Sequence, residues 1–289
     1  MANTRSVLIT GASSGIGRAI AIDLAAAGMQ VFGTVRSKED GLTLAQASPA
    51  GAHGIIPVEM DVCDMESVRA AAATVAEQCN HRLWGLVNNA GISVASPLEY
   101  LPIEAFEEQM DVNVTGVLRC VQAFLPLLKP TPGRIVNISS MSGRIGFPMV
   151  GAYIASKHAL EGLSDSLRLE MKVFGIEVSV IQPGSIETPI WQRSQARAAK
   201  LMATMPADGH RDYKAMLQEA QNSAESGGSG GTQPQACADV VRHALTAKRP
   251  RTRYPVGQDA KRALFFKRWL FSDRRLDKVM LRSMGLSSL

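Results

Sequence analysis

Two residues that can handle protons lie four positions apart, at Tyr153 and Lys157. On a helix, positions i and i+4 share a face, so the phenol and the ammonium would point into the same space. A neighbouring ammonium favours the phenolate, and we expect the pKa of Tyr153 to lie below its ordinary value of about 10. Such a tyrosine can donate and accept a proton near neutral pH. An ordinary amphipathic helix can carry the same pair. Other parts of the sequence are therefore needed to distinguish a catalytic pair from two surface residues.

A glycine-rich turn lies close to the start of the chain. Residues 6–10 are a short apolar run, and residues 16–27 have a helical pattern, which predicts a strand, a turn and a helix. In the turn, Gly11 permits a tight bend, while Gly15 and Gly17 let the backbone approach a pyrophosphate held by helix N–H groups. We therefore predict a dinucleotide site here rather than a plain loop.

The predicted second strand, residues 30–35, ends at Arg36. An acidic residue at this place binds the ribose hydroxyl of NAD, whereas a guanidinium matches the 2′-phosphate of NADP. We therefore expect NADP(H) to be preferred over NAD(H). The alternative is a solvated Arg36 at the strand end, with Glu39 and Asp40 nearby.

Strands alternate with helices along the first two thirds of the chain. Further strands are predicted at 54–59, 83–88, 134–138 and 177–182, and helices at 64–79, 104–128 and 150–174. This order predicts the α/β class, with a single Rossmann-type domain whose doubly wound parallel sheet has helices on both faces. Ligands of such sheets bind at the carboxyl ends of the strands.

Within this domain we expect three parts. Residues 1–185 would form the cofactor-binding and catalytic core, 186–235 a substrate lid, and 236–289 a last helix (234–247), a last strand (252–256) and a basic extension. Residues 190–226 have a polar helical pattern, and the Ser/Gly-rich run 226–232 is flexible by composition. A lid that excludes water is our preferred interpretation, and a surface insertion is the alternative.

Composition limits the class of protein. The chain has 289 residues, of which 46% are hydrophobic, and no apolar run approaches the length of a membrane span. We expect a soluble, cytoplasmic protein. Its four cysteines are scattered without metal-ligand spacing, so reduced thiols and no metal site are expected.

The positive charge is concentrated at the C-terminal end. The net charge is +5, but residues 248–289 hold twelve Lys or Arg against three Asp, a balance of +9. From residue 258 onward, aromatic and aliphatic residues alternate with these basic ones. Such a tail can lie on an anionic membrane, cover a patch between subunits, or dock as a helix with solvated charges. We expect no nucleic-acid partner.

Over about residues 5–190 the chain resembles a short-chain dehydrogenase/reductase. The matching motifs, in family order, are Thr10-Gly-x3-Gly15-x-Gly17, Asp61, Asn88-Asn-Ala-Gly91, Asn113, Ser140, Tyr153-x3-Lys157 and Pro183-Gly184. Residues 31–36 and the basic extension are similar to the group that contains 17β-hydroxysteroid and retinol dehydrogenases.

The resemblance implies roles for the matched residues. Tyr153 would be the general acid/base, and Ser140 would hold the substrate oxygen. Lys157 would bind the nicotinamide ribose and depress the pKa of the tyrosine, and Asn113 would anchor a water. The implied cofactor contacts are Gly11, Ser13, Ser14, Gly15, Ile16, Gly17, Arg36, Asp61, Val62, Asn89, Ala90, Gly91, Tyr153, Lys157, Pro183, Gly184, Ile186 and Thr188. The substrate contacts would be Ser140, Met141, Phe147, Tyr153 and Trp191. Of these, Met141, Phe147 and Trp191 suggest an apolar pocket, although core packing also explains them.

We therefore expect an NADP(H)-dependent oxidoreductase that interconverts a secondary alcohol and a ketone on a largely apolar small molecule, such as a steroid, retinoid or other lipid. Self-association as a homodimer or homotetramer is expected from the family. Two rivals remain: a nucleotide-sensing regulator that has lost chemistry, and a scaffold recruited to membranes by the tail. The presence of all four catalytic residue types argues against the first.

Overall fold

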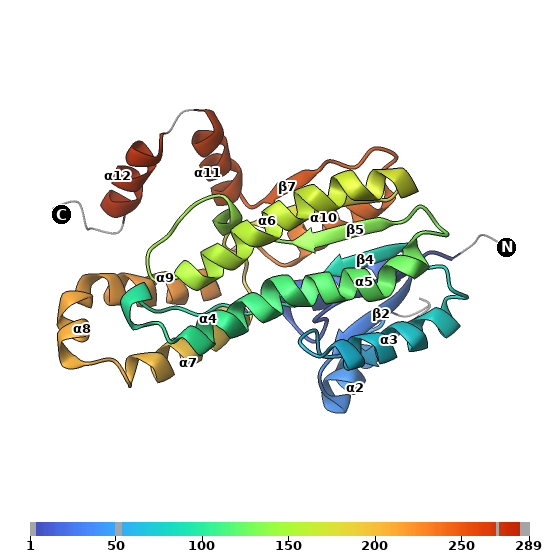
Figure 1. Ribbon diagram of the computed structural model, residues 1–289, viewed down its shortest axis with the longest axis horizontal. Coiled ribbons are helices and arrows are strands. Elements are labelled where there is room, and N and C mark those ends of the chain that lie inside the picture. Colours follow the sequence, from blue (N-terminus) through green and yellow to red (C-terminus); the bar gives the residue numbers. More distant parts are fainter. Residues whose placement is uncertain (1–3, 50–53, 270–271, 284–289) are drawn as a thin grey trace.

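The computed structural model describes residues 4–49, 54–269 and 272–283, and places seven parallel strands in one sheet (Figure 1). The spatial order is β3-β2-β1-β4-β5-β6-β7. The strands are β1 Ser6–Ile9, β2 Gln30–Val35, β3 Ile55–Glu59, β4 Gly85–Asn88, β5 Arg134–Ile138, β6 Glu177–Pro183 and β7 Arg253–Val256. The predicted doubly wound sheet is confirmed.

Helices cover both faces of this sheet. All the described helices are α1 Gly15–Ala26, α2 Lys38–Gln46, α3 Met65–Gln78, α4 Ile103–Met110, α5 Gly116–Leu128, α6 Gly151–Met171, α7 Ile190–Met202, α8 Ala207–Asp212, α9 Lys214–Ser229, α10 Gln235–Thr246, α11 Gln258–Trp269 and α12 Asp273–Ser283. Of these, α1, α2 and α10 lie on one face, and α3, α5 and α6 on the other. Short turns lie at η1 Leu98–Tyr100, η2 Asp111–Thr115, η3 Met141–Gly143 and η4 Lys172–Phe174.

Two apolar cores lie on the two faces of the sheet. One joins the strands to α1, α2 and α10, through side chains such as Leu24, Leu44 and Val241. The other joins them to α3, α5 and α6, through side chains such as Val68 and Phe124. Because both faces are covered, the central strands are almost entirely apolar rather than alternating, as parallel strands require.

The strand order reverses between β1 and β4. β1 pairs with β2 on one side and with β4 on the other, so the connections leave the two strands in opposite directions. This reversal opens a crevice at the carboxyl ends of the two strands, which is where open α/β sheets bind ligands. The glycine turn follows β1, and Asn89 to Gly91 follow β4.

The local start and stop signals in the sequence hold in the structure. Asp64 caps α3 by accepting a hydrogen bond from the backbone N–H of Glu66. Gly175 ends η4, which extends α6, in the left-handed conformation at φ 68°, a conformation that glycine adopts without strain.

One expectation is confirmed with an added detail, and another needs correction. The stretch 104–128 is helical as predicted, with a π-helical turn, η2, between α4 and α5. The Ser/Gly-rich run 226–232 was predicted to be flexible, but α9 continues through Ser229. Thr232 then forms a parallel bridge with Ile186.

The predicted lid and tail occupy separate places. Helices α7, α8 and α9 gather at one end of the molecule, and α11 and α12 lie beyond β7 (Figure 1). Within the described residues, no helix has the length and apolar character that crossing a bilayer requires. The division at residues 185 and 235 remains a prediction.

Candidate active site

The glycine turn requires glycine at three positions. Gly11 and Gly15 have φ of 65° and 56°, which favour glycine. A Cβ on Gly17 would overlap the carbonyl of Gly11 and the amide of Asn89. Ser14, the N-cap of α1, makes no side-chain hydrogen bond to the helix, so its first N–H groups remain available to an anion. This cradle fits a dinucleotide pyrophosphate.

Thr10 and Asn89 bind the two crevice loops together. The Thr10 hydroxyl accepts hydrogen bonds from the backbone N–H groups of Asn89 and Ala90, each at 2.9 Å. The Asn89 amide donates to the carbonyls of Thr10 and Gly11, at 2.9 and 3.0 Å. These four bonds fix the loop after β4 against the glycine turn.

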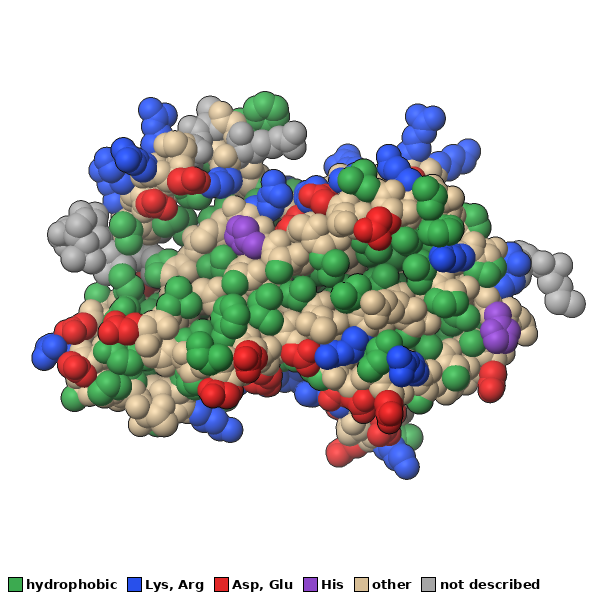
Figure 2. All heavy atoms as spheres, in the orientation of Figure 1, with side chains coloured by type: hydrophobic (Ala, Val, Ile, Leu, Met, Phe, Trp, Pro, Cys, Tyr) green, Lys and Arg blue, Asp and Glu red, His purple; other side chains and the backbone are tan. Residues whose placement is uncertain are grey.

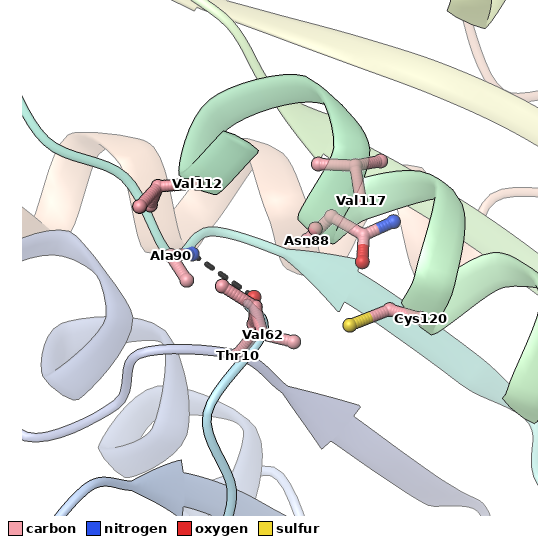
Figure 3. Close-up of a pocket in the computed structure, with 8 residues that line it drawn as sticks. Thr10, Val62, Asn88, Ala90, Val112, Val117 and Cys120 are labelled. Carbon is pink, nitrogen blue, oxygen red and sulfur yellow. Dashed lines mark hydrogen bonds between the residues drawn. The ribbon is translucent and has the colours of Figure 1, made fainter. Parts of the chain in front are cut away.

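A small hollow lies on the inner side of this crevice (Figure 3). Figure 3 shows the Ala90 N–H directed at Thr10, with Val62 and Cys120 on either side of the space. It is lined by Thr10, Val62, Asn88, Ala90, Val112, Gly116, Val117 and Cys120. Two predicted cofactor residues, Val62 and Ala90, therefore share one wall, while Tyr153 and Lys157 are not part of it.

Arg36 is exposed directly after β2. In the part of the chain that the structure describes, no ion pair joins it to Glu39 or Asp40. Asp40 instead belongs to the first turn of α2, where its backbone N–H donates to Ser37 Oγ at 3.2 Å. The guanidinium is thus not neutralised by its acidic neighbours.

Tyr153, Lys157 and Ser140 come together as predicted. Lys157 is 5% exposed; its Nζ donates to the carbonyl of Ile138 at 2.9 Å and lies 5.6 Å from the centre of the Tyr153 ring. Ser140, at the start of η3, accepts from the N–H of Ser142 at 3.1 Å and donates its hydroxyl to the Pro183 carbonyl at 3.4 Å. It also lies close enough to the Tyr153 phenol to lower the pKa of that phenol. A phenol, a hydroxyl and an ammonium therefore share one buried corner.

The expected depression of the pKa of Tyr153 is wrong for this structure. Burial of the phenol raises its pKa above the ordinary value, and the hydrogen bond with Ser140 only partly opposes this, although some surface of the residue remains exposed. Burial also lowers the pKa of Lys157 to about 8, against the opposing effect of Glu161. Loss of hydration disfavours each charged form, and it outweighs the attraction that the sequence suggested.

Asn113 lies in the π-helical turn η2 and is 1% exposed. Its amide oxygen accepts from the N–H of Ile92 at 2.9 Å, and its amide nitrogen donates to the Ile92 carbonyl and to Ser156 Oγ, both at 3.0 Å. A Cβ on Gly91 would lie 3.3 Å from Asn113 Oδ1 and 3.8 Å from Lys157 Nζ. Asn113 is therefore placed one small residue away from the lysine.

The loop after β6 closes over the glycine turn. A Cβ on Gly15 would lie only 3.2 Å from the side chain of Thr188. Ile186 is held by backbone hydrogen bonds that flank it, from Glu187 N to Thr232 O at 3.0 Å and from Thr232 N to Ser185 O at 2.9 Å. The two ends of the 186–232 segment are thus joined at its base.

The predicted substrate residues are partly buried side chains around this corner. Met141 and Phe147 lie in and after η3, and neither is fully buried. Trp191 donates its indole N–H to the Ile186 carbonyl at 2.8 Å, which leaves the ring faces for apolar contact. Met149 adopts φ 71°, an uncommon conformation that costs energy in a non-glycine residue.

Three residues near the site were missed from the sequence. Asp259 of α11 accepts from the N–H of Ser185 at 2.7 Å, directly after the Pro183-Gly184 motif. The buried Glu161 forms an ion pair with the partly buried Arg253 at 2.9 Å. For Glu161 a signal was present, because it continues the four-residue spacing of Tyr153 and Lys157. Among the described residues, no group of three His, Cys, Asp or Glu side chains is arranged to hold a metal ion.

Known proteins similar to this chain include oxidoreductases of one family. The model of the short chain dehydrogenase family matches residues 5–199. The NADPH-dependent 3-dehydrocapnine reductase of Ornithobacterium rhinotracheale is 33% identical over 288 residues, which cover 97% of each chain. Human 17-beta-hydroxysteroid dehydrogenase type 6 is 36% identical over 261 residues, which cover 88% of this chain and 81% of that protein.

A solved structure agrees along nearly the whole chain. The short chain dehydrogenase/reductase of Burkholderia phymatum, in complex with NAD, matches with a TM-score of 0.78 at 25% identity, covering 96% of this chain and 95% of that one.

Proposed function

Because this chain belongs to the short-chain dehydrogenase/reductase family and is therefore an NAD(P)-dependent oxidoreductase acting on alcohol and carbonyl groups, we propose that it interconverts a secondary alcohol and a ketone on a largely apolar small molecule, with NADP(H) as the preferred cofactor. The observation that carries the proposal is that the buried Ser140 and Lys157 lie beside the partly buried Tyr153, next to the cofactor crevice.

Tyr153 is the proposed general acid/base. When bound, the cofactor supplies or takes up a hydride at the carbonyl carbon. The phenol gives its proton to the ketone oxygen during reduction, while the Ser140 hydroxyl holds that oxygen in place. Since burial raises the pKa of Tyr153, the phenol is protonated at neutral pH, which suits a proton donor. Alcohol oxidation needs the phenolate, which the ammonium of Lys157 stabilises.

The other predicted contacts would hold the cofactor in place for the hydride and proton transfers. Gly11 to Gly17 and the start of α1 would hold the pyrophosphate, and Lys157 the nicotinamide ribose. Asp61 and Val62 would flank the adenine, and Thr188 would touch the carboxamide. Asn113 would anchor a water linked to Lys157, and its position one small residue from the lysine supports that role.

The preference for NADP(H) rests on Arg36. Its guanidinium is exposed and not paired with Glu39 or Asp40, so it can meet a 2′-phosphate. The NADPH-dependent relative from Ornithobacterium rhinotracheale is consistent with this preference.

The apolar nature of the substrate rests on Met141, Phe147 and Trp191, which are partly buried around the catalytic corner. The relative that acts on 17β-hydroxysteroids supports the same class. We propose that residues 186–235 form the lid over this substrate.

Two further proposals concern the whole chain. A homodimer or homotetramer would bury apolar side chains on α5 and α6, where Figure 2 shows hydrophobic side chains at the surface. Leu118 of α5 and Leu169 of α6 are 39% and 61% exposed. A solution mass equal to the 31.0 kDa of one chain would contradict this. The protein would otherwise be cytoplasmic, with its basic tail able to lie on a membrane surface.

The test of the reaction is turnover of a panel of ketones with NADPH. With an accepted ketone, Tyr153→Phe should lower kcat by about 100-fold or more, because the proton donor is lost. Tyr100→Phe, which removes a phenol outside the catalytic group, is the matched control and should retain turnover. Wild-type rates in Tyr153→Phe would overturn the assignment.

A further inference from the structure

Glu161 is a buried carboxylate on the catalytic helix. It lies on α6 four residues after Lys157 and is 3% exposed. A buried carboxylate is costly unless its oxygens are satisfied. Both are: Oε1 accepts from Gln182 Nε2 at 2.9 Å, and Oε2 accepts from Arg253 Nε at 2.9 Å. The chain therefore maintains a charge at this depth, and the proposed reaction does not use it directly.

The helix geometry places this charge beside the lysine. Residues four apart on a helix share a face, with their Cβ atoms roughly 5–6 Å apart. The η3 loop packs closely on this stretch of α6, because a Cβ on Gly143 would lie 2.9 Å from Glu161 Cγ and 3.0 Å from the Lys157 backbone carbonyl. Because Lys157 and Glu161 are both buried, their charges act on each other with weak screening.

The charged groups around Glu161 come from two elements. Helix α6 provides Lys157, the ionisable Tyr153 and Asp165, and β7 provides Arg253. Strand β6 contributes the neutral Gln182, and η3 carries no charged residue. Asp165 is 41% exposed and is bound by both Arg168 and Arg253. Glu161 is thus the buried anion of this group.

We propose that Glu161 is a positioning residue that keeps Lys157 in its ammonium form in the closed site, and that Arg253 and Gln182 hold the carboxylate in place for this purpose. The inference rests on the proposed role of Lys157. It assigns a function in the active site to β7, which lies outside the residues that match the family model.

The direction of the electrostatic effect agrees. Burial lowers the pKa of Lys157 to about 8, and the negative charge of Glu161 raises it. Without the charge of Glu161 the pKa of Lys157 falls further. Lys157 then loses its proton at a lower pH than in the wild type. The enzyme would then lose the ammonium form of Lys157 within the pH range in which it must work.

The experiment titrates Lys157 directly. In protein labelled with ¹³C and ¹⁵N at lysine, the side-chain NMR signal of Lys157, assigned by its absence in Lys157→Met, gives the titration midpoint. Glu161→Gln should lower this midpoint by about one pH unit or more. In parallel, kcat/KM for ketone reduction should begin to fall at a lower pH on the alkaline side. Glu161→Ala, which leaves room for water around Arg253, provides a second neutral variant if the first does not fold.

The matched control is Asp165→Asn. It removes the other carboxylate partner of Arg253 on the same helix, but at an exposed position one turn farther from Lys157. It should leave the midpoint and the pH profile unchanged, and Glu161→Asp, which keeps the charge, should retain most of the wild-type midpoint. An unchanged midpoint in Glu161→Gln, or an equal shift in Asp165→Asn, would overturn the inference. If no ketone is reduced even by the wild type, the proposed function fails, while the NMR midpoint still decides the role of Glu161.

Discussion

At the scale of single residues, Arg36 determines the cofactor prediction. It is exposed at the carboxyl end of β2 and is not neutralised by Glu39 or Asp40. A hydrogen bond to a charged group contributes about 1.5–3 kcal/mol, so Arg36→Asp should raise the KM for NADPH by about tenfold or more. The KM for NADH should change little or fall, because a carboxylate suits the free ribose hydroxyl.

Steady-state kinetics with both cofactors measure this change, and Lys38→Asp, two positions farther along and also exposed, serves as the control for a general loss of positive charge. Equal effects of Arg36→Asp on NADPH and NADH would rule out a phosphate-binding role.

The placement of the proposed catalytic residues was predictable because their spacing is local. Tyr153 and Lys157 share a face of α6 by helical periodicity alone, and the glycine turn follows directly from its strand and helix. The pKa of Tyr153 was not predictable, because it depends on how deeply the fold buries the phenol. Arg253, which binds Glu161 across 92 positions of sequence, was not predictable either, because only the sheet brings the two together.

At the scale of elements, the irregular parts were the hardest to predict. The period of residues 104–128 is helical throughout, yet η2 widens into a π-helical turn where Asn113 binds the backbone of Ile92. Such turns are frequent at functional sites. The Ser/Gly-rich run was misjudged because composition reports local preference, whereas α9 also contacts α7 and α8.

The helices of the proposed lid contact the core directly. Arg197 of α7 pairs with Glu108 of α4 at 2.8 Å. Tyr213, between α8 and α9, donates its hydroxyl to Glu99 at 3.0 Å, and its ring meets that of Tyr100 edge to face at 6.0 Å. Since the base of the lid is joined at Ile186 and Thr232, these distal contacts are the ones that opening must break.

We therefore expect Tyr213→Ala to favour the open lid. An edge-to-face pair contributes about 0.5–1.5 kcal/mol, so the open population should rise about fivefold. Hydrogen exchange should become faster across residues 190–225 but not in β5 or α6. Tyr213→Phe keeps the ring and loses the hydroxyl. Its exchange rates should lie between those of the wild type and those of Tyr213→Ala. Unchanged exchange in Tyr213→Ala would contradict a docked lid.

At the scale of the whole molecule, positive charge and exposed apolar side chains gather on the tail. Figure 2 shows Lys and Arg side chains over α11 and α12. Phe265 and Trp269 of α11 are 56% and 66% exposed. The start of α11 is nevertheless fixed to the core, because Asp259 accepts from Ser185 and Ala260 is fully buried. The tail is thus held firmly at one end and presents basic and aromatic side chains at its surface.

This arrangement suits an anionic membrane surface, which attracts each Lys or Arg near it by about 1 kcal/mol. We expect the protein to float with vesicles that contain phosphatidylserine but not with purely zwitterionic ones, and to be released by salt.

Arg262→Glu/Arg275→Glu should weaken this binding at least about tenfold, because two attractions become repulsions. Lys38→Glu/Arg69→Glu, on α2 and α3, reverses the same number of exposed charges away from the tail and should leave binding intact. If both double variants lose binding equally, the attraction belongs to the net charge of the chain rather than to the tail. If the wild type does not float at all, the membrane proposal is wrong. An interface between subunits would then explain the exposed apolar side chains of the tail.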